Sequence, residues 1–231
     1  MAPFIIESRY NGPPESGNGG YCAGLLSERL GRPVEVTLRA PPPLDTPLSV
    51  TETMDGARVH HGETLVMEAR PGAPSAKAPA SPGLEAARKG PAHYPGPDEH
   101  GLNTCFVCGP SRAAGDGLHI FAGRLEGTEL VASPWVPADD LAADDGKLRE
   151  RFLWAALDCP GAFSLPDTGF VLLGRMTARI DRRPAPGESL LVIGWPIGAE
   201  GRKHRAGTAI YTGGGERLAQ AEQTWIELKP S

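Results

Sequence analysis

A change of hydrophobic period, from helical to alternating, occurs twice along this chain and constrains its fold more than any other feature. In the first half, apolar residues recur at helical spacing over residues 20–30, and Gly31 and Pro33 then end the helix. Apolar and polar residues alternate over residues 34–39, as they do in a half-buried strand. Further strands are predicted at residues 48–53, 57–60 and 64–68. One helix followed by an antiparallel run of strands is therefore predicted.

The second half repeats this plan on a larger scale. A helix is predicted over residues 147–159, ended by Pro160 and Gly161, and two strands are predicted before it, at residues 118–125 and 129–135. Four longer strands are predicted after it, at residues 170–181, 188–195, 204–211 and 218–228.

Between the halves lies a segment rich in Pro, Ala and Gly, with no sustained period of either kind. Such composition is typical of a linker, and we expect this one to cross the surface. The predicted organisation is an N-terminal unit at residues 1–70, a linker at residues 71–101 and a C-terminal unit at residues 102–231.

Composition excludes some classes of protein. The net charge of −5 argues against a nucleic-acid binder, because phosphate recognition gathers Lys and Arg on one face. The chain opens without a basic stretch and a long apolar run, and nowhere do about 18 apolar residues follow one another. We therefore expect a cytoplasmic protein with no membrane partner. Four cysteines are too few for a disulfide scaffold, so free thiols are predicted.

Short motifs in the second half are typical of one family. Residues 103–110, which read Asn-Thr-Cys-Phe-Val-Cys-Gly-Pro, and the later pair Gly117 and Leu118 resemble the opening segment of phenylacetate-pathway-type acyl-CoA thioesterases of the hotdog fold. Residues 156–161, Ala-Leu-Asp-Cys-Pro-Gly, resemble the catalytic helix of that family. The last two strands resemble those of the family at residues 201–203, 206–209 and 218–225.

The resemblance implies an α+β fold, a double hotdog of two units, each with a central helix wrapped by an antiparallel sheet. A single hotdog unit needs a partner to complete its sheet and the site between two helices, and two units on one chain supply that partner internally. The sequence leaves open whether the chain stays a monomer or forms a homodimer of double hotdogs.

Two segments far apart in the sequence carry the predicted catalytic groups. Asn18, Gly19 and Gly20 stand where the family often has His-Gly-Gly at the start of the central helix, so Asn replaces His here. By the resemblance, backbone N–H groups of Gly19, Gly20 and Tyr21 hold the thioester oxygen, and Asp158 of the other half attacks the carbonyl or activates water. The alternative is structural: the glycines allow a tight helix start, and Asp158 bonds to nearby backbone.

The two halves do not offer equal sites. The depth of Asp158 in its helix corresponds to Ser27 or Glu28 in the first helix, so a second carboxylate exists. The start of the second helix, residues 144–149, has no paired glycines and contains two acidic residues, which would repel an oxyanion. We therefore predict one working site, which combines the glycines of the first half with Asp158.

Substrate contacts are predicted at a basic run and at one aromatic residue. Arg202, Lys203 and Arg205 lie on a hairpin where they could meet the phosphates of coenzyme A, although a charged hairpin tip is often only solvated. Trp154 lies one turn before Asp158 and could border an acyl pocket. The expected substrate is an acyl-CoA or an acyl-carrier thioester, with no metal or organic cofactor.

Cys105 and Cys108 form a lone Cys-x-x-Cys, half of a zinc site. The remaining ligands would have to come from His100, His119 and Cys159, which are scattered, so we expect the thiols to pack as small hydrophobic groups.

Two other functions compete with thioester hydrolysis. One is a non-catalytic acyl-CoA or acyl-chain binding protein of the same fold, in which the glycines are structural. The other is a hotdog hydratase or dehydratase, which needs a catalytic His paired with an acid. The spacing associated with hydratases occurs at Asp55 and His60, but on a predicted turn and strand rather than at a helix start.

Overall fold

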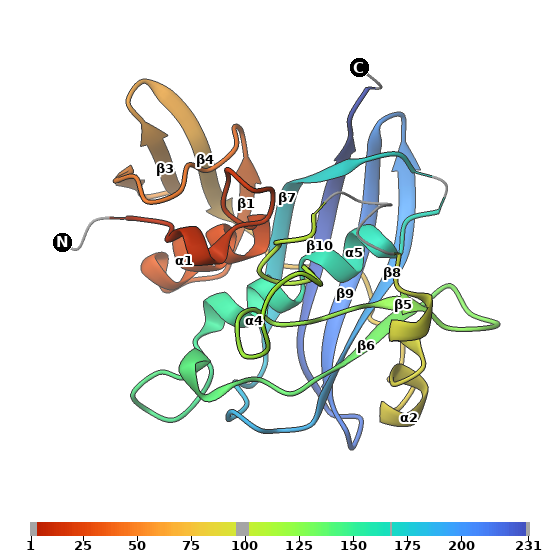
Figure 1. The fold of residues 1–231 in the computed structure, drawn as a ribbon. Coiled ribbons are helices and arrows are strands. Elements are labelled where there is room, and N and C mark those ends of the chain that lie inside the picture. The colour runs from red at the N-terminus through yellow and green to blue at the C-terminus, as the bar shows by residue number, and fades with distance from the viewer. Residues whose placement is uncertain (1–3, 96–101, 167, 230–231) are drawn as a thin grey trace.

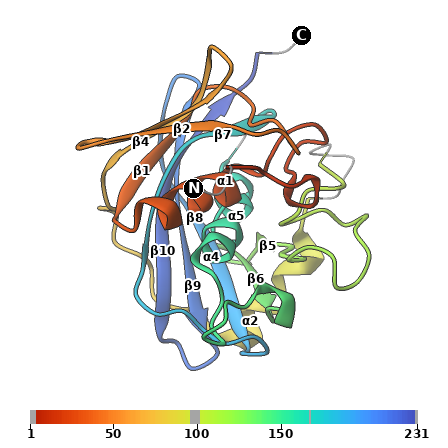
Figure 2. The ribbon, with the colours of Figure 1, turned by 90° about the vertical axis from the view of Figure 1, so that its left-hand side faces the viewer.

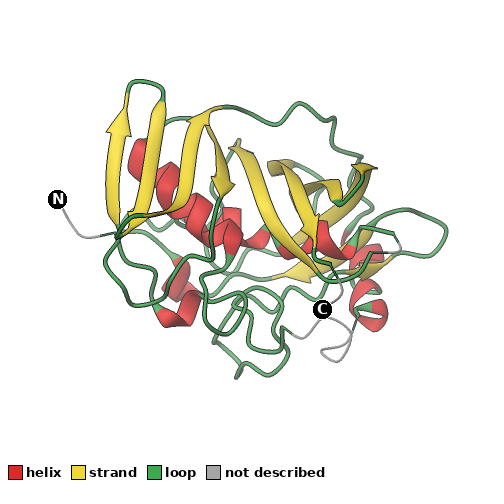
Figure 3. Cartoon of the chain, turned by 90° about the horizontal axis from the view of Figure 1, so that it is seen from above, coloured by secondary structure: helices red, strands yellow, loops and turns green. Residues whose placement is uncertain are grey.

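The computed structural model describes residues 4–95, 102–166 and 168–229. Ten strands form one sheet in the order β2-β3-β4-β1-β7-β10-β9-β8-β6-β5 (Figure 1). Every pairing of named strands in this sheet is antiparallel. Strands dominate over short helices, and long loops join them (Figure 3). The large antiparallel sheet with few helices agrees with the predicted α+β class.

The first half contains one helix and four strands, as predicted. Helix α1 spans Gly19–Leu30, and its end is set by Gly31, whose φ of 60° lies in the left-handed region that favours glycine. The strands that follow are β1 at Val34–Leu38, β2 at Ser49–Thr53, β3 at Gly56–His61 and β4 at Thr64–Pro71.

The second half supplies the remaining strands and two short helices beside them. The strands are β5 at Gly123–Arg124, β6 at Val131–Trp135, β7 at Val171–Ile180, β8 at Leu190–Glu200, β9 at Lys203–Thr212 and β10 at Arg217–Glu227. The helices are α4 at Glu150–Ala156 and α5 at Cys159–Phe163, and short 3-10 turns occur at Ser8–Tyr10, Gly90–His93 and Asp139–Leu141. None of the described helices is long and apolar enough to cross a membrane.

The strand predicted at residues 118–125 is wrong except at its end. His119 has a φ of 50°, which breaks an extended strand. The backbone N–H groups of Leu118 and Ile120 donate to the carbonyls of Phe106 and Val107, at 2.8 and 2.9 Å. These residues are therefore tied to the preceding loop, and only β5 joins the sheet.

The single helix predicted at residues 147–159 is also wrong, because two helices stand there with a break between them. Pro160 has no N–H to donate to the carbonyl of Ala156, and its ring would clash with that carbonyl in a continuous helix. Pro160 instead lies in the first turn of α5, where a missing N–H costs nothing. The break falls at Leu157 and Asp158, and the backbone N–H of Gly161 donates to the carbonyl of Asp158 at 3.0 Å rather than to that of Leu157.

The two halves join edge to edge through β1 and β7, where Val36 pairs with Met176. Helices α1 and α4 pack against each other on one face of the sheet (Figure 2). Gly24 allows this close packing, since a Cβ there would lie 2.7 Å from both the Cα of Arg151 and the Cβ of Trp154. The main hydrophobic core lies between these helices and the sheet.

The described part of the linker crosses the other face of the sheet. Leu190 and Val192 of β8 belong to the main core, whereas Leu191 and Ile193 belong to a second cluster with Ala87 of α2, a helix at Leu84–Ala87. Successive residues of a strand point to opposite faces, so α2 covers the face opposite α1. Residues 96–101 of the predicted linker lie outside the described residues, and the unit boundaries stay predictions.

Candidate active site

Asp158 lies at the break between α4 and α5 and reaches the start of α1. Its Oδ2 accepts hydrogen bonds from the backbone N–H of Gly20 at 2.9 Å and from Nδ2 of Asn18 at 2.8 Å. Asp158 is only 3% exposed. The two segments that the sequence analysis paired, 138 and 140 residues apart at these contacts, thus meet in one buried site.

Buried polar side chains from β9 and β10 hold the backbone at the helix break. Thr208 Oγ1 donates to the carbonyl of Leu157 at 2.8 Å, and Gln223 Nε2 donates to the carbonyls of Leu157 and Asp158 at 2.6 and 3.1 Å. Trp225 Nε1 in turn donates to Gln223 Oε1 at 3.0 Å, which fixes the orientation of the amide. The contacts to Leu157 replace the helical partner that the break removes, and together these bonds hold the backbone that carries Asp158.

Gly20 is required by the close approach of Asp158. A Cβ at Gly20 would lie 2.6 Å from the carbonyl oxygen of Trp154 and 2.7 Å from the Cβ of Asp158. The first of these atoms belongs to the backbone, so the clash could be relieved only by moving the backbone of α4. A glycine at this position is therefore a condition for the contact between the two halves.

Asn18 has two roles at the start of α1. Its Oδ1 accepts from the backbone N–H of Tyr21 at 2.9 Å, which is a helix N-cap, while its Nδ2 donates to Asp158. Of the three amides predicted to form an oxyanion hole, those of Gly20 and Tyr21 already donate to side chains. The Gly19 N–H makes no hydrogen bond with the residues that the structure describes.

The electrostatics of Asp158 differ from those of an exposed carboxylate. Burial raises its pKa to about 7, against the stabilising hydrogen bonds from Gly20 and Asn18. Both of these donors bind Oδ2, and Oδ1 has no hydrogen-bond partner among the described residues. One oxygen of the carboxylate is therefore held in place and the other is uncommitted.

A cavity of about 900 Å³ adjoins the site. Asn18, Gly19 and Asp158 line one part of it. Apolar side chains supply much of the remaining wall, among them Leu38, Leu102, Phe163, Leu165, Phe170, Leu173, Trp225 and Ile226. A cavity of this size and character can hold an apolar group beside the uncommitted oxygen of Asp158.

The second carboxylate, Glu28, is fully engaged. Its Oε1 accepts from the backbone N–H of Arg151 at 2.8 Å, and its Oε2 accepts from Nε of the same residue at 2.6 Å. Helix α4 begins at Glu150, three residues later than predicted, so Asp145 does not lie at the helix start. Asp145 instead forms an ion pair with Arg183.

Trp154 and the basic residues do not line the cavity. Trp154 is 1% exposed and packs between the helices at Gly24, and it is not among the residues that line this cavity. Arg205 forms an ion pair with Glu222, and Arg202 donates to the carbonyl of Glu227 at 3.3 Å. Lys203 is exposed and pairs in the sheet with Ile226, which does line the cavity.

The residues with hydratase-type spacing lie apart from this site. Asp55 is an exposed turn residue, and His60 belongs to β3, whose neighbour β2 is the edge strand of the sheet. Neither residue lines the cavity that contains Asp158.

No protein-family model and no curated protein matches this chain. Several solved structures do match this chain in fold. A protein of Novosphingobium aromaticivorans described as a candidate thioesterase superposes with a TM-score of 0.60 at 14% identity, covering 98% of this chain and 94% of its own. A tesB protein of Mycobacterium avium subspecies paratuberculosis superposes with a TM-score of 0.58 at 13% identity, covering 92% and 88%.

This chain has the fold of those proteins. A candidate thioesterase II of Thermobifida fusca gives a similar result, with a TM-score of 0.57 at 15% identity and coverage of 94% and 89%. The resemblance inferred from the sequence motifs is thus confirmed at the level of the fold, and the coverage extends over both halves of the chain.

Proposed function

We propose that this chain is a double-hotdog thioesterase that hydrolyses an acyl-CoA or a related acyl thioester. The observation that carries the proposal is the uncommitted Oδ1 of Asp158, buried beside a cavity with largely apolar walls. A carboxylate in such a setting has the pKa of a general base near neutral pH. Two of the three fold neighbours, those of Novosphingobium aromaticivorans and Thermobifida fusca, are named as thioesterases, which motivates the reaction class.

In the proposed reaction, Oδ1 of Asp158 takes a proton from a water molecule, and the resulting hydroxide attacks the thioester carbonyl carbon. The carbonyl oxygen becomes an oxyanion, for which the Gly19 amide at the positive end of α1 is the remaining donor. The C–S bond then breaks as the carbonyl re-forms, and the thiolate takes up the proton from Asp158. The acid and the thiol leave, and the carboxylate is restored.

Direct attack by Asp158 is the other route that the residue permits. It would form an anhydride between the carboxylate and the acyl group, which water then cleaves. A single turnover in ¹⁸O-labelled water places label in Asp158 when an anhydride is hydrolysed at its aspartyl carbon. Trapping with hydroxylamine detects an anhydride that water cleaves at the acyl carbon, and the proposed general base gives neither label nor trapped aspartyl hydroxamate.

Unequal use of the two halves is part of the proposal. Asp158 has a neutral partner in Asn18, but Glu28 is paired with the guanidinium of Arg151, and both of its oxygens are taken. The Glu28 side therefore offers no free oxygen to accept a proton from water. We propose a single working site per chain, at Asp158.

The test is the release of free thiol from a panel of acyl-CoA substrates of different acyl length and aromatic character. Turnover that disappears in Asp158→Asn supports the proposal. Binding of the same acyl-CoA compounds without thiol release would identify the chain as a binding protein of this fold and would reject the proposal.

A further inference from the structure

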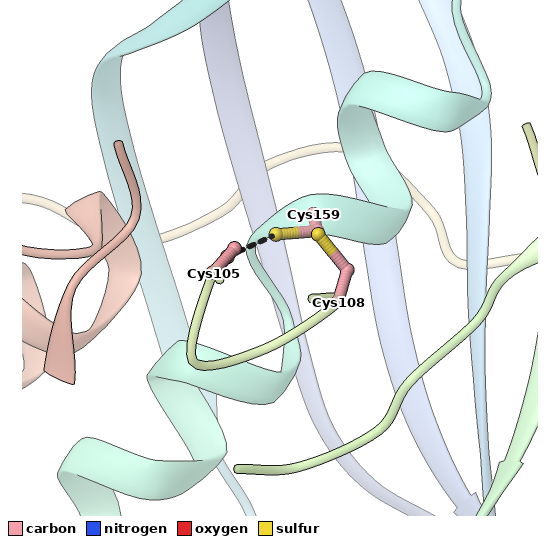
Figure 4. A group of neighbouring side chains, drawn as sticks. All are labelled: Cys105, Cys108 and Cys159. Atoms are coloured by element: carbon pink, nitrogen blue, oxygen red, sulfur yellow. Dashed lines mark hydrogen bonds between the residues drawn. The ribbon is translucent and has the colours of Figure 1, made fainter. Parts of the chain in front are cut away.

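Three of the four cysteines converge beside the active site. The Sγ atoms of Cys105, Cys108 and Cys159 all lie within 4.8 Å of one another, and those of Cys105 and Cys159 are 3.7 Å apart (Figure 4). Cys105 and Cys108 come from the loop after Leu102, and Cys159 is the first residue of α5. The sequence analysis named Cys159 as one of three scattered candidates for completing the Cys-x-x-Cys pair, and the structure brings it, at the start of α5, next to Cys105.

The spacing of the sulfur atoms suits a metal better than a disulfide. Zinc binds thiolate sulfur at about 2.3 Å with tetrahedral angles, which puts the sulfur atoms about 3.8 Å apart. A disulfide needs an S–S distance of about 2 Å, and all three cysteines are free thiols here. Three thiols gathered at this separation, inside the protein, have the arrangement of a preformed ligand set.

The loop that carries Cys105 and Cys108 is rigidly built. The backbone N–H of Gly109 donates to the carbonyl of Cys105 at 2.8 Å, which closes a tight turn around the pair. A Cβ at Gly109 would lie 2.6 Å from the backbone N and O of Cys105, so the turn admits only glycine. On the other side, the bonds from Leu118 and Ile120 to the carbonyls of Phe106 and Val107 hold the loop against the core.

We propose that Cys105, Cys108 and Cys159 bind a zinc ion whose fourth coordination position faces the active-site cavity. All three residues line that cavity together with Asp158, so a water molecule or a bound ligand can supply the fourth donor from this side. Soft thiolate ligands select zinc over magnesium or calcium, which prefer oxygen. His119 takes no part, because its ring bonds to the carbonyl of Ala113, and His100 lies outside the described residues.

The site is tested by the metal content of the purified full-length chain, produced with zinc in the medium. We expect about one zinc per chain, the stoichiometry of a mononuclear site. Cys105→Ser and Cys159→Ser should each lose most of it. The matched control is Cys22→Ser, which alters a buried cysteine outside the cluster and should keep the metal.

A second measurement does not depend on the folding of the variants. Cobalt(II) added to metal-free wild-type chain should produce the strong near-ultraviolet absorption of thiolate-to-cobalt charge transfer, and zinc should displace it. The proposal would be overturned if the wild-type chain took up neither metal or carried a disulfide between Cys105 and Cys159. It would also be overturned if a folded Cys105→Ser variant kept its zinc.

Discussion

Asp158, which follows α4, and Glu28, which lies in α1, make equivalent contacts across the two helices that pack side by side. Asp158, just after the end of α4, accepts a hydrogen bond from the backbone N–H of the second residue of α1, Gly20. Glu28, near the end of α1, accepts one from the second residue of α4, Arg151. Each helix therefore presents a carboxylate to the positive end of the other, as two antiparallel helices allow.

The equivalence ends at the next neighbour of each carboxylate. Arg151 adds its guanidinium to Glu28, which neutralises the charge and uses the second oxygen. Asn18 gives Asp158 only a neutral amide donor, and this donor binds Oδ2, the same oxygen that accepts from Gly20. The same helix pair thus carries one carboxylate with both oxygens paired and one with an oxygen that has no partner among the described residues.

Asp158→Asn should lower kcat/KM for thioester hydrolysis by a factor of about 10² to 10⁴, the usual contribution of a general base. The asparagine oxygen can still accept from Gly20, so the fold should be kept. Thiol release gives the rate, and a thermal melt followed by circular dichroism serves as the control for folding. Full activity in this variant would remove Asp158 from the mechanism.

Glu28→Gln should lower stability but leave activity nearly unchanged. The amide oxygen can still accept from Arg151, but the ion pair is lost, so we expect a fall in the free energy of unfolding of about 1 kcal/mol, as for a weakened helix cap. The rate of thioester hydrolysis should stay within about twofold of wild type, a change of less than about 0.5 kcal/mol in the barrier. Urea unfolding and thiol release measure the two quantities. Loss of activity in Glu28→Gln, with full activity in Asp158→Asn, would show that Glu28 and not Asp158 carries the reaction.

Gly20→Ala should reduce both stability and activity, because the added Cβ meets the carbonyl of Trp154 and the side chain of Asp158. Overpacking of this kind costs about 1–3 kcal/mol, and the displaced carboxylate should lower kcat. Gly213→Ala is a matched control, since a Cβ there meets its nearest atom at 3.4 Å, an ordinary contact. If both alanine variants behave as wild type does, the tight approach at Gly20 does not govern the site.

Asn18 can be tested by separating its helix cap from its side-chain donor. Asn18→Ser keeps an oxygen that can cap Tyr21 but removes the Nδ2 donor to Asp158 and to Cys105 Sγ, so activity should fall while stability is largely kept. Asn18→Ala removes the cap as well and should also cost about 1 kcal/mol of stability, as lost N-caps do. Thermal melts and thiol release on the two variants give the comparison. Equal activity of Asn18→Ser and wild type would leave Asn18 as a helix cap only.

Local patterns predicted the parts of the fold that are decided locally. Helix α1 and the long strands follow from residue periodicity, and the glycines before Tyr21 and the isolated Asp158 marked the two sides of the site. The sequence pattern misread Pro160 as the end of a helix, since proline suits the first turn of a helix as well as the residues after its end. Only the surrounding strands, through Thr208 and Gln223, decide between these readings.

Other features depend on contacts between distant residues and have no local signal. Thr208 and Gln223 lie at buried positions on strands β9 and β10. A polar residue at a core position was the one indication that each makes a specific hydrogen bond. Likewise, the ion pair between Glu28 and Arg151 arises only when the two halves pack together, and the approach of Cys159 to Cys105 joins segments 54 residues apart within the second half.

Arg202 and Lys203 remain the predicted contacts for the phosphates of coenzyme A, and their place in the fold suits that role. Both are exposed, and Lys203 pairs in the sheet with Ile226, a cavity residue, so the basic hairpin stands next to the cavity wall. Changing both to Ala should raise KM for acyl-CoA several-fold, and leave KM for an N-acetylcysteamine thioester unchanged, because the latter has no phosphates. Changing Arg88 and Lys89 to Ala removes an adjacent exposed pair at the end of α2, on the other face of the sheet, and should leave both values unchanged. An equal rise in KM for both substrates would assign the Arg202 and Lys203 effect to the packing of β9 against β10 rather than to phosphate binding.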